Sequence, residues 1–115
     1  MTKPHLSQWT EAGSLVFVSG QLPFDANRRI SATDIGGQTR QAVSNLESVL
    51  RDAGLGLADV VKATVWLAKA ADFAAFNESY AAAFGETRPA RSTVVCPLVL
   101  PEALIEIEAV ARRQS

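Results

Sequence analysis

The segment PARSTVVCPLVLPEALIEIE, residues 89–108, decides how this chain folds. Apolar and polar residues alternate in its second half, which is typical of a β-strand with one buried face. A strand there places Ile105 and Ile107 on the face that packs against the core. Glu106 and Glu108 then share the opposite face, so the segment predicts two carboxylates side by side on a sheet.

The first half of the same segment is also strand-like, and it puts Arg91 and Thr93 on one face. Pro97 and Pro101 interrupt the connection, because proline cannot sit inside a central strand. If the two strands pair directly, the Arg91 guanidinium and a glutamate carboxylate meet on one sheet face. From the pattern alone this pair is either a surface salt bridge worth about 0–1 kcal/mol or part of a binding site.

Composition limits the classes of function that the chain can have. Its 115 residues suit a single domain, 1–115, and 11 basic against 12 acidic residues disfavour binding to nucleic acid. A lone cysteine, Cys96, excludes an internal disulfide, and with one histidine, His5, there is no zinc-ligand set; we expect no metal. Cys96 is read as a small apolar filler, although thiol catalysis is the alternative. No membrane-spanning or leader segment is evident, so we expect no membrane partner and a cytoplasmic location.

Hydrophobic periodicity predicts two strands, a helix, a strand, a second helix and two more strands in one α+β domain. The first strand is short and lies near residues 7–11, and the second, residues 14–21, is predicted to be buried on both faces. A helix begins after an N-cap at Thr33 or Asp34 and ends at Gly54. The later elements are a strand over 60–67 with Val61, Ala63, Val65 and Leu67 on one face, and a helix over 71–84 that Gly85 ends. Both helices should pack on one face of a mixed sheet and leave the other face for partners.

Two residues outside the central segment are unusual for a plain scaffold. Gly20 ends the second strand, where the missing side chain allows a ligand or another backbone to come close; the alternative is a simple strand terminus. Asn77 lies beside an aromatic stripe of the second helix, so its amide needs a partner, which a backbone carbonyl or water ordinarily provides.

The combination Pro-Ala-Arg-Ser-x-Val, a proline-interrupted gap and Ile-Glu-Ile-Glu-Ala resembles the signature of the YjgF/RidA family of reactive-intermediate imine deaminases. The similarity extends over residues 16–110 and includes a Val-Ser-Gly-Gln segment and a Phe-x-x-x-Asn-x-x-Tyr segment. It implies a chorismate-mutase-like fold and a homotrimer with clefts between subunits. Glu106 and Glu108 would then lie at or near the assembly surface.

The resemblance also implies a reaction, the hydrolysis of small 2-imino or enamine acids to 2-keto acids and ammonia without a cofactor. Arg91 suits the substrate carboxylate, because its planar fork makes two parallel hydrogen bonds. Glu106 suits the role of general base toward water. The remaining substrate-binding residues that the family pattern implies are Ser19, Gly20, Phe76, Asn77 and Thr93.

The chain departs from the family pattern at two places. Imine deaminases carry a pocket tyrosine in the N-terminal segment, where this chain has Leu6, and often a cysteine where it has Thr93. A non-catalytic carboxylate-binding or regulatory member of the family therefore stays open as the alternative function. A chorismate mutase would call for several converging arginines, and the central segment has one. A ribonuclease would call for a basic, aromatic surface that the sequence does not show.

Overall fold

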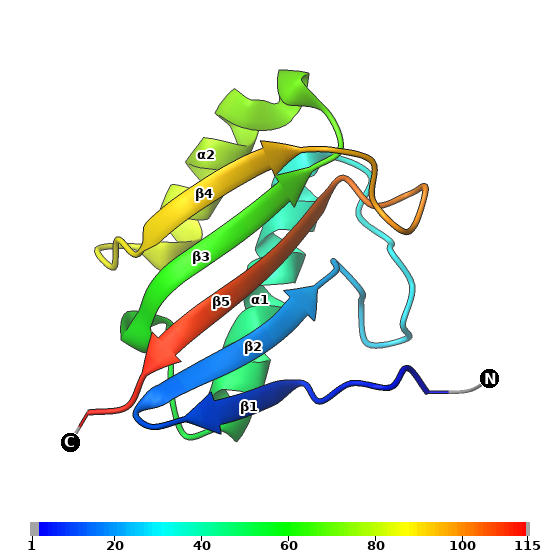
Figure 1. The fold of residues 1–115 in the computed structure, drawn as a ribbon. Helices are drawn as coiled ribbons and strands as arrows, with labels where there is room; N and C mark the ends of the chain where they lie inside the picture. The colour runs from blue at the N-terminus through cyan, green and yellow to red at the C-terminus, as the bar shows by residue number, and fades with distance from the viewer. Residues whose placement is uncertain (1–2, 115) are drawn as a thin grey trace.

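The computed structural model of the protein describes residues 3–114, which form one five-stranded sheet covered by two helices (Figure 1). Short 3₁₀ turns, Leu57–Asp59 and Ala70–Asp72, precede β3 and α2. The element order confirms the predicted one. In chain order the strands and helices are β1 (Trp9–Ala12), β2 (Leu15–Gln21), α1 (Ile35–Asp52), β3 (Val60–Leu67), α2 (Phe73–Phe84), β4 (Ala90–Val95) and β5 (Ile105–Arg112).

The strand order across the sheet is β1-β2-β5-β3-β4, with β4 at one edge. Strand β3 runs parallel to β4 and antiparallel to β5, so the sheet is mixed, as predicted. Direct pairing of the two strands from the central segment does not occur, because β3 lies between β4 and β5. A parallel pair needs a crossover, and α2 makes that crossover from β3 to β4.

Both helices lie behind the sheet in Figure 1 and cover one face of it, as the sequence predicts. The apolar stripe of α1 is buried against this face, with Leu46 and Leu50 completely shielded from solvent. Strands β3 and β5 contribute Val65 and Ile107, which lie opposite each other and are also fully buried. The core of the chain is therefore the layer between α1, α2 and the helix-covered face.

Local signals at the ends of α1 act as expected. The Asp34 side chain caps the first turn by accepting a hydrogen bond from the Gly37 backbone N–H at 3.1 Å. At the other end Gly54 has a φ of +81°, and Leu55 N–H donates to the Leu50 carbonyl at 2.8 Å. This left-handed glycine with a backward hydrogen bond ends the helix and turns the chain toward β3.

Two sequence predictions about burial are wrong. Strand β2 is not buried on both faces, since Phe17 is 42% exposed on the side that no helix covers. Val61 does not join the core face of β3 either; it is 44% exposed, and Val60 is buried in its place. The pairing of β3 with β5 shifts register between Val60 and Lys62, and this irregularity turns Val61 outward.

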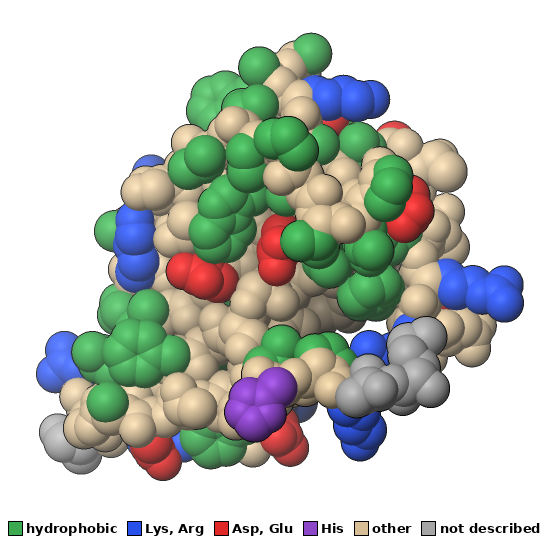
Figure 2. All heavy atoms as spheres, turned by 45° about the vertical axis from the view of Figure 1, so that its right-hand side comes forward, with side chains coloured by type: hydrophobic (Ala, Val, Ile, Leu, Met, Phe, Trp, Pro, Cys, Tyr) green, Lys and Arg blue, Asp and Glu red, His purple; other side chains and the backbone are tan. Residues whose placement is uncertain are grey.

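The uncovered sheet face is unusually apolar for a surface. Phe17 and Val94 are large hydrophobic side chains that stay about two-fifths exposed there. Figure 2 shows acidic side chains surrounded by hydrophobic ones on this side of the molecule. None of the helices within residues 3–114 is long and apolar enough to cross a membrane.

Candidate active site

The first group of predicted site residues gathers around Arg91 on β4. Arg91 pairs with Ala63 of β3 in the sheet, so its side chain projects from the helix-covered face toward α2. Its Nη2 donates a hydrogen bond of 2.8 Å to Asn77 Oδ1. The guanidinium carbon also lies 4.9 Å from the ring centre of Phe76 and 4.8 Å from that of Tyr80. Cation–π contacts of this kind stabilise by about 0.5–2 kcal/mol each and fix the plane of the fork.

The positive charge of Arg91 has no carboxylate partner within 4.0 Å among residues 3–114. A guanidinium carries five N–H donors, and the hydrogen bond to Asn77 uses one of them. Arg91 is half-buried, so the rest of the fork is held at a surface and remains available to an anion. The prediction that Asn77 needs a partner is confirmed, although the partner is Arg91 and not a backbone carbonyl.

Glu106 lies on the other face of the sheet. Glu106 of β5 pairs with Trp66 of β3, and its side chain projects from the face that the helices do not cover. A Cβ atom on Gly20 would collide with the Glu106 carboxylate, so the absent side chain of this glycine makes room for it. The close approach predicted at Gly20 therefore exists, with a carboxylate of the same chain as the neighbour.

The Glu106 carboxylate opens into a hollow of about 260 Å³. Its lining combines apolar side chains with two carboxylates, and the lining residues are Gly20, Trp66, Cys96, Pro97, Leu98, Val99, Glu106 and Glu108. Burial raises the pKa of Glu106 above the usual glutamate value, and the nearby negative charge of Glu108 raises it further. No basic residue is part of the described lining to oppose this shift. Glu106 is thus a carboxylate whose proton affinity is increased, as a general base near neutral pH requires.

The other predicted residues divide between these two places. Thr93 is half-buried and pairs with Val65, so it shares the helix-covered face with Arg91. Phe76 is fully buried, and the Arg91 guanidinium lies over its ring. Ser19 directs its hydroxyl to the Ser7 carbonyl at 2.6 Å and so holds the N-terminal segment next to the end of β2.

Within one chain, Arg91 and Glu106 do not meet. The register aligns Arg91 with the core-facing Ala63, whereas Glu106 aligns with Trp66, whose side chain points the other way. The sequence-based expectation that the two charged groups share one sheet face is therefore wrong. The candidate residues thus form two separate clusters, one around Arg91 and one around Glu106, and each is called a half-site because it holds only one of the two charged groups.

Two features of these half-sites carried no predicted role. Tyr80 supplies the second ring against Arg91, and its i, i+4 spacing from Phe76 on a helix was the available signal. Leu98 and Val99 form part of the wall of the Glu106 hollow, and the signal for them was the apolar run between Pro97 and Pro101.

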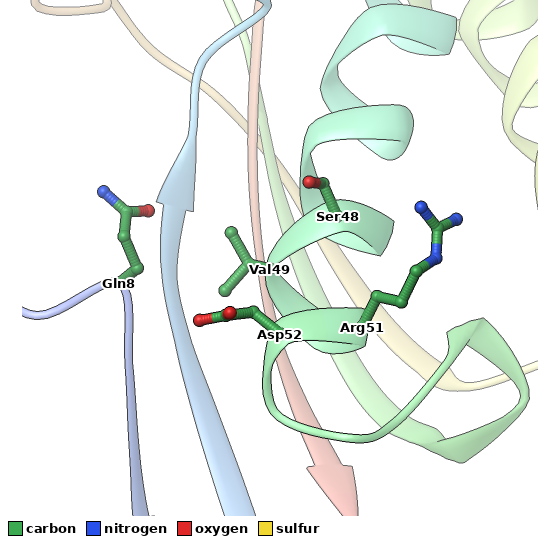
Figure 3. Close-up of a pocket in the computed structure, with 5 residues that line it drawn as sticks. All are labelled: Gln8, Ser48, Val49, Arg51 and Asp52. Carbon is green, nitrogen blue, oxygen red and sulfur yellow. The ribbon is translucent and has the colours of Figure 1, made fainter.

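A larger open hollow of about 470 Å³ lies between the N-terminal segment and the end of α1 (Figure 3). Its charged and amide side chains already have partners within the described chain. Asp52 accepts a hydrogen bond from Trp9 Nε1 at 3.3 Å, Gln8 accepts one from Gln21 at 3.0 Å, and Arg51 lies 3.6 Å from Glu47. None of the predicted site residues lines this hollow, so it does not join either half-site.

The fold and its two half-sites define a small α+β protein built on one mixed sheet, and comparison with known proteins gives its relationship. A family model described as Endoribonuclease L-PSP matches residues 2–113. The chain belongs to the YjgF/RidA family, which this model represents.

Known members of the family are close in sequence and in structure. A RutC family protein of Pyrococcus horikoshii is 44% identical over 94% of this chain and 86% of its own length. A 2-iminobutanoate/2-iminopropanoate deaminase of Salmonella typhimurium is 40% identical over 93% of this chain and 86% of its own length. The crystal structure of Escherichia coli TdcF with bound serine is 35% identical, with a TM-score of 0.88, and the match covers 99% of this chain and 91% of that one.

Proposed function

We propose that the protein hydrolyses small 2-imino acids to 2-keto acids and ammonia, at sites where Arg91 of one subunit faces Glu106 of another in a homotrimer. The observation that carries the proposal is that both charged groups are present and prepared, yet each lies on its own sheet face without an opposite charge nearby in the described chain. A second copy of the chain can bring its Glu106 close to Arg91 of the first copy. The apolar uncovered face, with Phe17 and Val94 exposed, supports such an assembly.

Arg91 would bind the substrate. A 2-imino acid carries a carboxylate directly beside its C=N bond, and a guanidinium fork can hold that carboxylate through two parallel hydrogen bonds. The rings of Phe76 and Tyr80 limit the fork to one plane, and this would fix where the imine carbon lies. The 2-imino acid substrate of the Salmonella relative has the same arrangement of groups.

Glu106 would activate water. In the first step, the carboxylate takes a proton from water while the oxygen attacks the imine carbon and the C=N electron pair moves to nitrogen. In the second, the glutamic acid returns that proton to nitrogen, giving a carbinolamine. The carboxylate then carries the hydroxyl proton to the same nitrogen while the C–N bond breaks, so ammonia leaves and the C–O bond becomes the keto group. Imine and water are thus converted to 2-keto acid and ammonia with no oxidant or reductant. The raised pKa of Glu106 supports both transfers, because the group must accept and return a proton near neutral pH.

A binding or regulatory role without catalysis is the second candidate, and Leu6 favours it. Leu6 stands where the family pattern has a pocket tyrosine, and it is 56% exposed on the N-terminal segment. An aromatic hydroxyl is therefore missing from this position, while the carboxylate-binding arginine is retained. Such a protein would bind 2-keto or 2-imino acids and release no ammonia.

Ammonia release from 2-aminoacrylate and 2-iminobutyrate, each generated in situ, tests the proposal. We expect the protein to accelerate release well above the spontaneous rate in buffer. Release at the buffer rate, together with measurable binding of 2-oxobutyrate, would instead establish the binding role.

A further inference from the structure

Arg91 has no carboxylate within 4.0 Å among residues 3–114, and this is uncommon for a half-buried cation. Buried charges are usually paired with an opposite charge, because desolvation without a partner is costly. Arg113 of the same chain follows that rule, since its Nε lies 2.8 Å from Glu11 Oε2. Arg91 has instead one amide oxygen and two aromatic ring faces.

All three partners of Arg91 come from one side of α2. Phe76 and Tyr80 are one helical turn apart, and their ring centres lie 5.3 Å from each other. Asn77 follows Phe76 directly and reaches the guanidinium from the same helix. Stacking of Tyr80 on Phe84, with ring centres 4.5 Å apart, holds the outer ring in turn. The positions of all three groups therefore depend on α2 and not on flexible loops.

We infer that Phe76, Asn77 and Tyr80 form an uncharged clamp that positions the Arg91 guanidinium for the carboxylate of the ligand. This inference rests on the proposed function, and it assigns Asn77 and Tyr80 as positioning residues that act through Arg91. The ring faces and the amide oxygen hold the fork without neutralising it. A carboxylate in their place would hold Arg91 equally well but would occupy the charge that the ligand needs.

Asn77→Asp is the sharpest test, because it keeps the shape of the side chain and adds the missing negative charge. Binding of 2-oxobutyrate, a stable 2-keto acid, is measured by calorimetry. The structure predicts that Asn77→Ala weakens binding about threefold to tenfold, since the ligand keeps its own contacts with Arg91 and only one positioning hydrogen bond is lost. Asn77→Asp should weaken binding by at least about a further tenfold, since the introduced carboxylate competes with the ligand. The matched control is Ala82→Asp, which adds the same charge to an exposed position of α2 and should bind like wild type.

Tyr80 tests the aromatic part of the clamp. Its hydroxyl has no hydrogen-bond partner in the described structure, so Tyr80→Phe should bind 2-oxobutyrate within about twofold of wild type. Tyr80→Leu removes the ring face and should weaken binding about threefold to tenfold. It should also move the Arg91 Nε–Hε resonance in a ¹H–¹⁵N spectrum, because the guanidinium loses one of its two neighbouring aromatic rings. Loss of an unrelated packing contact would leave this resonance in place.

Several results would overturn the clamp. Equal affinities of Asn77→Asp and Asn77→Ala in folded protein would show that the charge of this side chain is irrelevant. An equal loss in Ala82→Asp would show a general effect of charge. If wild type binds 2-oxobutyrate but releases no ammonia, the proposed reaction fails while the clamp stands. If wild type binds no 2-keto acid, the Arg91 resonance decides, and an unchanged resonance in both Tyr80→Leu and Asn77→Asp rules the clamp out.

Discussion

The Arg91 cluster and the Glu106 hollow hold their charges in opposite ways. Arg91 is fixed by side chains, with one hydrogen bond and two ring faces from a single helix. Glu106 has room because Gly20 has no side chain, and most of the other residues that line its hollow are apolar. The contacts that hold Arg91 all come from its own chain, whereas the face that holds Glu106 leaves the large hydrophobic side chains of Phe17 and Val94 exposed. The difference indicates that the fold of one chain fixes the position of the Arg91 guanidinium, whereas the Glu106 carboxylate lies in an open hollow of the uncovered face.

Assembly gives the largest expected difference between the two faces. We expect the protein to sediment as a homotrimer at micromolar concentration, because burying the uncovered face removes exposed hydrophobic surface from water. Val94→Asp introduces a charge at an exposed hydrophobic position of that face and should yield monomers that keep their secondary structure. Ser44→Asp, on the exposed side of α1, is the control and should leave the mass unchanged. A monomeric wild type would remove the inter-subunit site from consideration.

Glu106→Gln tests whether the second half-site carries the chemistry. Glutamine keeps the shape of the side chain but cannot accept a proton from water, so imine hydrolysis should fall by roughly 10²–10⁴-fold. Binding of 2-oxobutyrate, which depends on Arg91, should change much less. Glu108→Gln is the comparison, because Glu108 is on the same sheet face one pleat further along β5. It removes a charge that raises the pKa of Glu106 but leaves the base in place, so hydrolysis should fall far less than in Glu106→Gln. If neither substitution reduces ammonia release, Glu106 is not the base.

Arg91→Lys tests the first half-site with a smaller change. Lysine retains the charge but loses the planar fork, so 2-oxobutyrate binding should weaken by roughly 1–3 kcal/mol in free energy. Folding and assembly should survive, as circular dichroism and sedimentation can verify. Binding as tight as wild type would mean that Arg91 has a structural role only.

The smallest expected effects are those of pH on hydrolysis and on stability, and they test the Glu106 half-site directly. Glu106 acts as a base only when ionised, so kcat/KM should fall as pH drops through a pKa that lies above the usual glutamate value. The same raised pKa means that the folded state binds this proton more tightly than the unfolded state does. The stability from this group is therefore fully present below the unfolded pKa and is lost as pH rises through the folded pKa. Glu106→Gln should accordingly unfold at a slightly higher temperature than wild type at neutral pH, with the difference shrinking in acid.

The sequence by itself determined the order and type of the elements and most of the buried face. Alternation in residues 104–111 indicated which side of β5 is core. The N-cap signal at Thr33 or Asp34, of which the structure uses Asp34, and Gly54 indicated the limits of α1. These signals are local, since each depends on a few residues whose spacing sets their direction. The same alternation correctly put Glu106 and Glu108 opposite the core side chains.

Only the tertiary structure decided which groups come together. Strand β3 enters the sheet between β4 and β5, and this separates Arg91 and Glu106, which are close in sequence, onto opposite faces. Strand order is a property of the whole sheet, because many residues distant in sequence contribute to each pairing. The residue pattern of one strand therefore cannot specify which strand lies next to it in the sheet. The two rings against Arg91 likewise required α2 to pack beside β4, although the spacing of Phe76 and Tyr80 was visible in the sequence.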